Sequence, residues 1–233
     1  MKLIKKIHFL GLILIIPSLI TGPFLPDLIV SITGIIFLVI SIKERNFKYY
    51  KSKISIFFFF FNAYLVFNSL VSEYILLSLE SSLFYFRFTF LILSVWYAIE
   101  NYENFIKYFT NLFLITISYV LIDAYTQYFF GYNIFGFPYI SNRLSGVFGD
   151  ELVLGSFLSR LFPLLFALLI LTKKNLNLIL AIILLLLIDI LVFLSGERLA
   201  FFNLILFFAI IMLLIKKWKL IRLISFMISL SII

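Results

Sequence analysis

The sequence has no cysteine, a single histidine and few charged residues. Without cysteine the chain can form no disulfide, no thiolate metal site and no cysteine nucleophile. The lone histidine, His8, stands at the start of an apolar run, where we expect it to lie at the membrane interface and to be inert, and we expect no metal site. Charged residues are 13% of the chain, against about a quarter in an ordinary soluble domain. No motif for nucleotide binding or serine hydrolysis is visible.

Apolar side chains dominate the composition of the chain. The 233 residues are 64% hydrophobic and 20% aromatic. A soluble fold of this size could not hide so much apolar surface, because much of any small protein remains exposed. The apolar runs are long and continuous rather than alternating, which favours helices over the strands of a membrane barrel. The sequence therefore predicts an all-α, polytopic transmembrane helical bundle.

Cutting the sequence at charged and turn residues predicts eight or nine spans within one transmembrane domain, residues 1–233. The first run follows lysines, as in a signal peptide, but no small-residue cleavage site follows it, so we expect a retained helix. A longer polar and aromatic loop is predicted over 130–150. The predicted spans are roughly 7–21, 28–42, 54–71, 83–99, 108–129, 152–172, 177–194 and 199–215, with a ninth from Leu223 to the end of the chain.

The basic residues predict the orientation of the bundle. Fifteen of the 19 lie in alternate segments, 1–6, 43–53, 100–107, 173–176 and 216–222. The intervening turns at 22–27, 72–82, 130–150 and 195–198 hold only Arg143 and Arg198. Because positively charged loops stay in the cytoplasm, we expect a cytoplasmic N-terminus. The net charge of +8 is thus attributed to topology, and no nucleic-acid partner is expected.

The basic residues outside the cytoplasmic segments are all arginines: Arg87, Arg143, Arg160 and Arg198. A guanidinium group keeps its charge and offers a planar fork that matches phosphate or carboxylate oxygens. Arg87 and Arg160 stand about one and two turns inside their predicted helices, where an unpaired charge is costly. They are candidate binding residues. The alternative is that they reach the interface or pair with Asp123, Asp150 or Asp189.

Carboxylates flank these arginines. Asp150 and Glu151 begin the predicted helix 152–172, where the helix dipole favours negative charge and capping alone would explain them. Arg143 with Gly146 and Gly149 could instead form a loop whose backbone approaches an anion.

Three further carboxylates could act as counter-ions. Glu197 either pairs with Arg198 or another arginine within a tight turn, or points to a different partner, since neighbours on a helix do not face each other. Asp123 and Asp189 stand inside their helices near the outer boundary. Each could be a general base, but we favour the counter-ion role because a buried charge without a partner is costly.

Two sequence blocks resemble the O-antigen ligase and polymerase family. The first runs Arg143-Leu-Ser-Gly-Val-Phe-Gly-Asp-Glu-Leu-Val-Leu-Gly-Ser-Phe-Leu, and the second is Leu-Ser-Gly-Glu-Arg198-Leu-Ala. In that family an Arg-x-Ser-Gly-x-Phe stretch precedes a helix and a Ser-Gly-x-Arg turn follows the next one. The resemblance implies a glycosyltransferase of the bacterial inner membrane that acts in the biosynthesis of lipopolysaccharide or another surface polysaccharide.

The resemblance also implies substrates and roles. Such enzymes transfer a glycan from undecaprenyl diphosphate to the lipid A core, or to a growing polysaccharide, on the periplasmic side, and use no cofactor. Arg143 and Arg198 match the arginines assigned to the donor diphosphate. The family's proposed base is a histidine in a large periplasmic loop beyond the ninth helix, which this sequence does not contain. We therefore expect a truncated member and leave the catalytic base unassigned.

Two other functions remain open from the sequence. A transporter or channel could line its pathway with Asp123, Asp189, Arg87 and Arg160. A non-catalytic scaffold in a polysaccharide assembly complex is the third possibility. The sequence shows no internal repeat, and its outer charges cluster near one leaflet rather than at the membrane centre, so the transferase is favoured.

Overall fold

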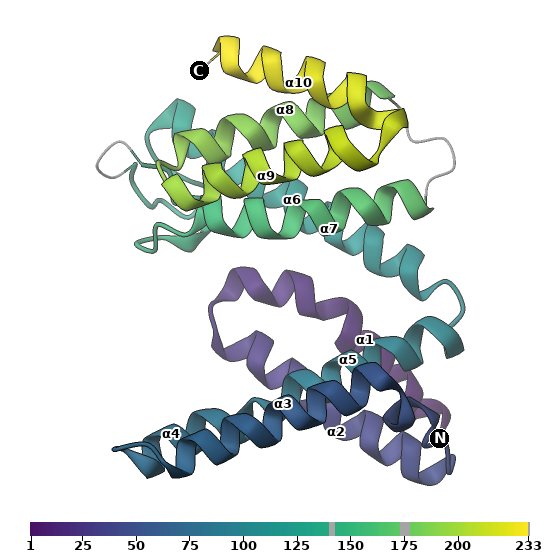
Figure 1. Cartoon of the computed structure of the whole chain (residues 1–233). Coiled ribbons are helices and arrows are strands. Elements are labelled where there is room, and N and C mark those ends of the chain that lie inside the picture. The colour runs from purple at the N-terminus through teal and green to yellow at the C-terminus, as the bar shows by residue number, and fades with distance from the viewer. Residues whose placement is uncertain (140–142, 173–177, 233) are drawn as a thin grey trace. The chain divides into compact units, whose positions relative to one another are not determined.

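The computed structural model describes residues 1–139, 143–172 and 178–232. Every element of regular secondary structure in these ranges is a helix, which confirms the all-α fold class. The chain divides into two compact units, Met1–Phe109 and Thr110–Ile233 (Figure 1). Each unit is described by itself below, and the single transmembrane domain stays a prediction.

Unit 1 consists of helices joined by short turns. At the first turn Gly22 adopts a φ of +99°, a backbone conformation that glycine adopts without strain. Gly11 lets α1 approach α2 closely, because a Cβ at this position would clash with the methyl group of Thr33. The elements are α1 (Lys2–Ser18), η1 (Leu19–Thr21), α2 (Phe24–Lys43), η2 (Lys48–Lys51), α3 (Lys53–Leu70), α4 (Ile75–Phe84), α5 (Phe86–Asn101) and the start of α6 (Phe105–Phe130).

The predicted outer turn at 72–82 is largely helical instead. Most of it forms α4, which packs against α3 and is followed at once by α5 (Figure 1). The serines that suggested a turn bond locally: the Ser69 hydroxyl donates to the Ser78 carbonyl at 3.1 Å, and the hydroxyls of Ser72 and Ser78 lie 2.8 Å apart. Serine is common in turns for this reason, yet it is tolerated in a helix when its hydroxyl finds an acceptor.

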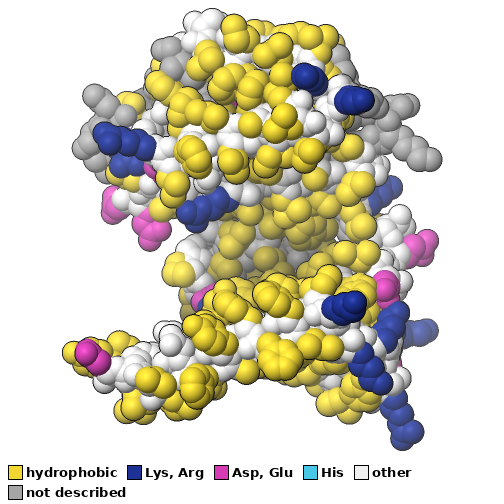
Figure 2. All heavy atoms as spheres, in the orientation of Figure 1, with side chains coloured by type: hydrophobic (Ala, Val, Ile, Leu, Met, Phe, Trp, Pro, Cys, Tyr) yellow, Lys and Arg dark blue, Asp and Glu magenta, His cyan; other side chains and the backbone are white. Residues whose placement is uncertain are grey.

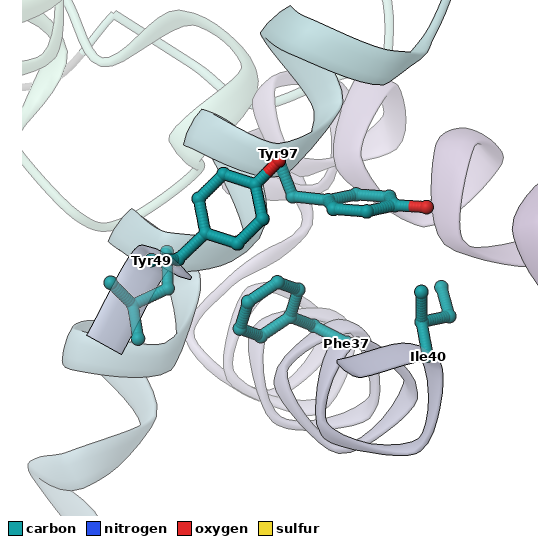
Figure 3. Packing of buried hydrophobic residues seen from close by; sticks show 5 residues of the cluster. Phe37, Ile40, Tyr49 and Tyr97 are labelled. Carbon is teal, nitrogen blue, oxygen red and sulfur yellow. The ribbon is translucent and has the colours of Figure 1, made fainter. Parts of the chain in front are cut away.

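Aromatic side chains form the core of unit 1. Figure 3 shows Phe37 facing Tyr49 and Tyr97, with its ring centroid 6.0 and 5.9 Å from theirs. The prediction that His8 is interfacial is wrong, because its side chain is fully buried beside this core. Its ring nitrogens lie 2.7 Å from the Tyr102 hydroxyl and 2.5 Å from the Ser94 hydroxyl. These bonds satisfy the imidazole within the fold.

Unit 2 contains the rest of α6 and four further helices. The loop after α6 includes a short 3-10 turn, η3 (Gly146–Phe148), and η4 (Lys216–Trp218) joins the last two helices. In unit 2, α7 packs against α8 and α9, and α10 packs against α8 and α9. The helices are α7 (Leu154–Thr172), α8 (Leu178–Leu194), α9 (Arg198–Leu214) and α10 (Lys219–Ile232).

The described residues contain six helical segments long and apolar enough to cross a membrane. Much of the surface seen in Figure 2 is apolar, as expected of helices that face lipid. The chain therefore has the character of a multi-pass membrane protein. Helices α8 and α9 are apolar but shorter, so the count of eight or nine spans stays a prediction. The six segments are Lys2–Thr21, Phe24–Lys43, Lys53–Leu70, Ile75–Asn101, Phe105–Phe130 and Leu154–Thr172.

Candidate functional site at the Ser195–Arg198 turn

The loop between α6 and α7 is fixed to α6 by a buried glutamine. The Gln127 side-chain oxygen accepts hydrogen bonds from the backbone N–H groups of Ser145 and Gly146, at 3.0 and 2.8 Å. Its amide nitrogen donates to the carbonyl groups of Phe137 and Pro138, at 3.3 and 3.1 Å. One side chain thus joins the two halves of the loop. Without it, these buried backbone N–H and carbonyl groups would need water as their hydrogen-bond partner.

Asp123 is part of the same network and is not the counter-ion of an arginine. Its carboxylate accepts hydrogen bonds from the backbone N–H of Ile134 at 3.1 Å and from the Asn133 side-chain amide at 3.2 Å. Asn133 also donates to the Gly146 carbonyl at 2.8 Å, and its side-chain oxygen caps a local turn. The predicted pairing of Asp123 with an outer arginine is therefore wrong. The carboxylate holds the loop instead.

The two loop glycines do not offer an open anion site. Both have positive φ, +55° at Gly146 and +61° at Gly149. However, the Gly146 N–H donates to Gln127 and the Gly149 N–H donates to the Gly146 carbonyl at 3.3 Å. The ring of Phe137 covers Gly149, where an added Cβ would lie 3.1 Å from it. The alternative of an anion-binding loop at these glycines is not supported, because both N–H groups are occupied.

Glu197 caps helix α7 from a different part of the chain. Its carboxylate accepts hydrogen bonds from the backbone N–H of Gly155 at 2.7 Å and of Ser156 at 3.1 Å, and from the Ser156 hydroxyl. The first N–H groups of a helix have no partner inside it, and the positive end of the dipole favours a carboxylate there. Of the two alternatives for Glu197, pairing with an arginine or pointing to a different partner, the contacts support the second: its partners are backbone and side-chain groups of Gly155 and Ser156.

The sequence suggested that Asp150 and Glu151 begin the helix, but they do not. Helix α7 starts at Leu154, and both carboxylates precede it and are exposed. The capping role assigned to them belongs to Glu197. This contact requires a glycine at position 155, because a Cβ there would clash with the Ser195 hydroxyl and lie 3.0 Å from the Glu197 carboxylate.

Arg143 lies across the turn that carries Arg198. Its Nε donates to the Ser195 carbonyl at 2.9 Å. Gly196 has a φ of +70°, and a Cβ there would lie 3.2 Å from both Cγ and Nε of Arg143. Among the described residues only Ser195 accepts a hydrogen bond from Arg143. The N–H groups on the two terminal nitrogens of Arg143 therefore remain available to donate. Two arginine-bearing segments that are 52 residues apart in sequence therefore meet at one turn.

A hollow opens on the same turn. It has a volume of about 240 Å³, and Arg198 is exposed beside it. The exposed guanidinium group of Arg198 lines this hollow, and such a group can bind an oxyanion in a bidentate manner. Arg143 is half-buried and contacts the same turn. The lining residues are Val192, Phe193, Gly196, Glu197, Arg198 and Phe201.

Asp189 pairs with an arginine that sequence reasoning placed in a cytoplasmic loop. Its carboxylate bonds to Arg222 of α10, and both side chains are buried. The guanidinium also lies 5.4 to 5.7 Å from the ring centroids of Phe207, Phe208 and Phe226. The counter-ion role predicted for Asp189 is confirmed, but its partner is not one of the four outer arginines. Arg222 was missed because three lysines precede it, so that it was assigned to the same cytoplasmic segment. However, Asp189 inside an apolar helix indicated that a buried cation should lie near it.

The other two candidate arginines lie elsewhere. Arg87 is in unit 1, where its Nη2 lies 2.9 Å from a carboxylate oxygen of Asp27. The alternative reading for Arg87 was a pair with Asp123, Asp150 or Asp189; it does pair with a carboxylate, but that of Asp27. Arg160 is exposed on α7. Of the four outer arginines, Arg143 is the one whose described contacts reach the turn that precedes Arg198, through Ser195 and Gly196.

Comparison with known proteins adds no relative. No family model, no curated protein and no solved structure matches the chain. Within the described residues no group of three or more histidine, cysteine, aspartate or glutamate side chains could hold a metal ion.

Proposed function

We propose that the chain is a multi-pass membrane protein that binds a lipid-linked diphosphate at the Ser195–Arg198 turn and acts in glycan transfer. The observation that supports this is the contact of Arg143 with the turn that carries Arg198. The diphosphate of a polyprenyl carrier has oxygens on two phosphorus atoms, which two guanidinium groups can share. The apolar helices would hold the polyprenyl chain.

The proposed reaction is the transfer of a glycan from undecaprenyl diphosphate to lipid A core or to a growing polysaccharide. The bond between the anomeric carbon and the diphosphate oxygen breaks, and a bond to an acceptor hydroxyl forms while that hydroxyl loses its proton. Negative charge develops on the leaving diphosphate, and fixed guanidinium groups near it lower the barrier. The base that takes the proton is not assigned.

The proposal includes a location and a topology. Eight or nine spans would cross the inner membrane of a bacterium, with the N-terminus and the lysine-rich segments in the cytoplasm. The Ser195–Arg198 turn and the 130–150 loop would then face the periplasm. Membrane lipids are the remaining partner, and no cofactor is proposed.

The experiment is a transfer assay with the full chain in proteoliposomes and a glycan linked to undecaprenyl diphosphate. We expect Arg143→Lys and Arg198→Lys each to lower the transfer rate at least tenfold, because lysine keeps the charge but loses the bidentate fork. Arg45→Lys is the matched control, since Arg45 is exposed and lies in unit 1, and it should keep full activity. Equal rates in all three variants, or no transfer by the unchanged protein, would contradict the proposal.

The buried Asp189–Arg222 pair favours a second candidate, a transporter. Ionisable side chains buried in a membrane bundle often mark an ion or substrate pathway. A transporter that uses this pair should lose flux when both charges are removed in Asp189→Asn with Arg222→Gln. If the pair has only a structural role, the double variant should change stability and leave glycan transfer in the folded fraction intact.

A further inference from the structure

The two ends of unit 1 differ in charge, and side-chain contacts define each end. At one end the start of α1 meets the end of α2 through the Lys5–Glu44 ion pair, and η2 meets the end of α5 through Lys48 and Glu100. Tyr97 of α5 donates to Glu44 at 3.0 Å. The hydrogen bond to Glu100 raises the pKa of Lys48 above its ordinary value, so this pair stays charged at neutral pH.

This end carries most of the charge of the unit. Nine cations stand there against three carboxylates, those of Glu44, Glu100 and Glu103. The opposite end has Asp27, Glu73 and Glu80 with Arg87 as its only cation. We call the first end the cationic end. Its cations are Lys2, Lys5, Lys6, Lys43, Arg45, Lys48, Lys51, Lys53 and Lys107.

Most of these cations are not neutralised within the fold. Residues 1–109 are described without a gap, and the ion pairs among them at this end involve only Lys5 and Lys48. The seven others are exposed and have no carboxylate partner: Lys2, Lys6, Lys43, Arg45, Lys51, Lys53 and Lys107. Several cations are visible at the lower right of Figure 2. Exposed cations attract anions over a distance of one Debye length, which is ~8–10 Å in physiological salt.

Aromatic side chains with polar tips lie at this end of unit 1. Trp96 donates its indole N–H to Glu100 at 2.8 Å, and Tyr49 donates its hydroxyl to the same carboxylate at 2.9 Å. Tryptophan and tyrosine collect where a membrane meets water, with the apolar ring in lipid and the polar tip in the headgroup region. A headgroup-level position of this end would put the exposed lysines beside lipid phosphates.

We propose that the cationic end of unit 1 binds the headgroups of anionic phospholipids of the surrounding membrane. The surface combines exposed cations from three different segments, so that several phosphates can be contacted at once. Clusters of four to eight basic residues next to a membrane helix bind anionic lipids in this way. Each cation near an anionic surface contributes about a fivefold factor to affinity. This interaction does not depend on the function proposed for the Ser195–Arg198 turn.

The test measures which lipids stay with the full-length protein. The chain is placed in nanodiscs with equal amounts of phosphatidylglycerol and phosphatidylcholine, then extracted gently, and the retained lipids are counted by native mass spectrometry. We expect phosphatidylglycerol to be enriched about tenfold in the unchanged protein. Lys43→Gln, Lys51→Gln and Lys53→Gln together should remove most of the enrichment, whereas the same three positions changed to arginine should keep it.

Two further arms separate the possible anions and exclude misfolding. Inorganic phosphate at 10 mM should not displace the lipid, because it lacks the membrane anchor that concentrates headgroups at this surface, while about 0.5 M NaCl should weaken retention by screening. The melting temperatures of both triple variants in detergent should match, which shows that the fold is kept. Unchanged enrichment in the glutamine variant, loss of enrichment in the arginine variant, or full displacement by phosphate would each overturn the proposal.

Discussion

At the scale of single residues, the side chains with the clearest roles are those that join distant segments. Gln127 joins two halves of a loop, Arg143 contacts the turn beside Arg198, and Glu197 caps α7. The sequence marked Arg143 and Glu197 as candidates because charged residues stood out near apolar runs. It could not give their partners, since a cap supplied from 42 residues away depends on tertiary packing.

Removal of the Glu197 carboxylate should destabilise unit 2. Glu197→Ala leaves the N–H groups of Gly155 and Ser156 without their acceptor, and a lost charge-assisted cap costs about 1–3 kcal/mol. We therefore expect a lower melting temperature for the detergent-purified protein. Glu151→Ala is the matched control, because Glu151 is exposed and precedes the helix. Equal melting temperatures for the two variants would show that the cap contributes nothing.

At the scale of helices, apolar runs predicted the elements well and their ends less well. Eight predicted spans correspond to helices of the structure, and the ninth corresponds to α10. The errors lie at 72–82, where serines and glutamates suggested a turn, and at Arg222, which stands inside α10 and not before it. In both places polar residues were taken as boundaries although local or tertiary bonds satisfy them within a helix.

The Asp189–Arg222 pair should hold α10 against α8. Asp189→Ala leaves a buried guanidinium unpaired, which costs about 3–5 kcal/mol. We expect protease cleavage near α10 to become faster in this variant. Exchange of the two residues, Asp189→Arg with Arg222→Asp, should restore part of the protection because the pair is re-formed. If protease cleaves Asp189→Ala near α10 no faster than the unchanged protein, the aromatic contacts hold α10 without the ion pair.

At the scale of the whole molecule, composition alone predicted an all-helical membrane protein, and six long apolar helical segments agree with it. The side-chain contacts of unit 1 also agree with alternating spans, because Lys5–Glu44 joins the start of α1 to the end of α2 and Arg87–Asp27 joins the starts of α5 and α2. The resemblance to a glycan transferase family stays a prediction, since it depends on short motifs and no family model, curated protein or solved structure matches the chain.

The proposed topology puts the lysine-rich segments in the cytoplasm and the Ser195–Arg198 turn in the periplasm. Because the chain has no cysteine, single cysteines can be labelled without background. The first substitution, Phe135→Cys, is at an exposed position in the loop between α6 and α7. The second, Lys51→Cys, is at an exposed position of the cationic end. In intact cells with a permeable outer membrane, a membrane-impermeant maleimide should label only position 135, and both positions after lysis. Labelling of position 51 in intact cells, alone or with 135, would contradict the account.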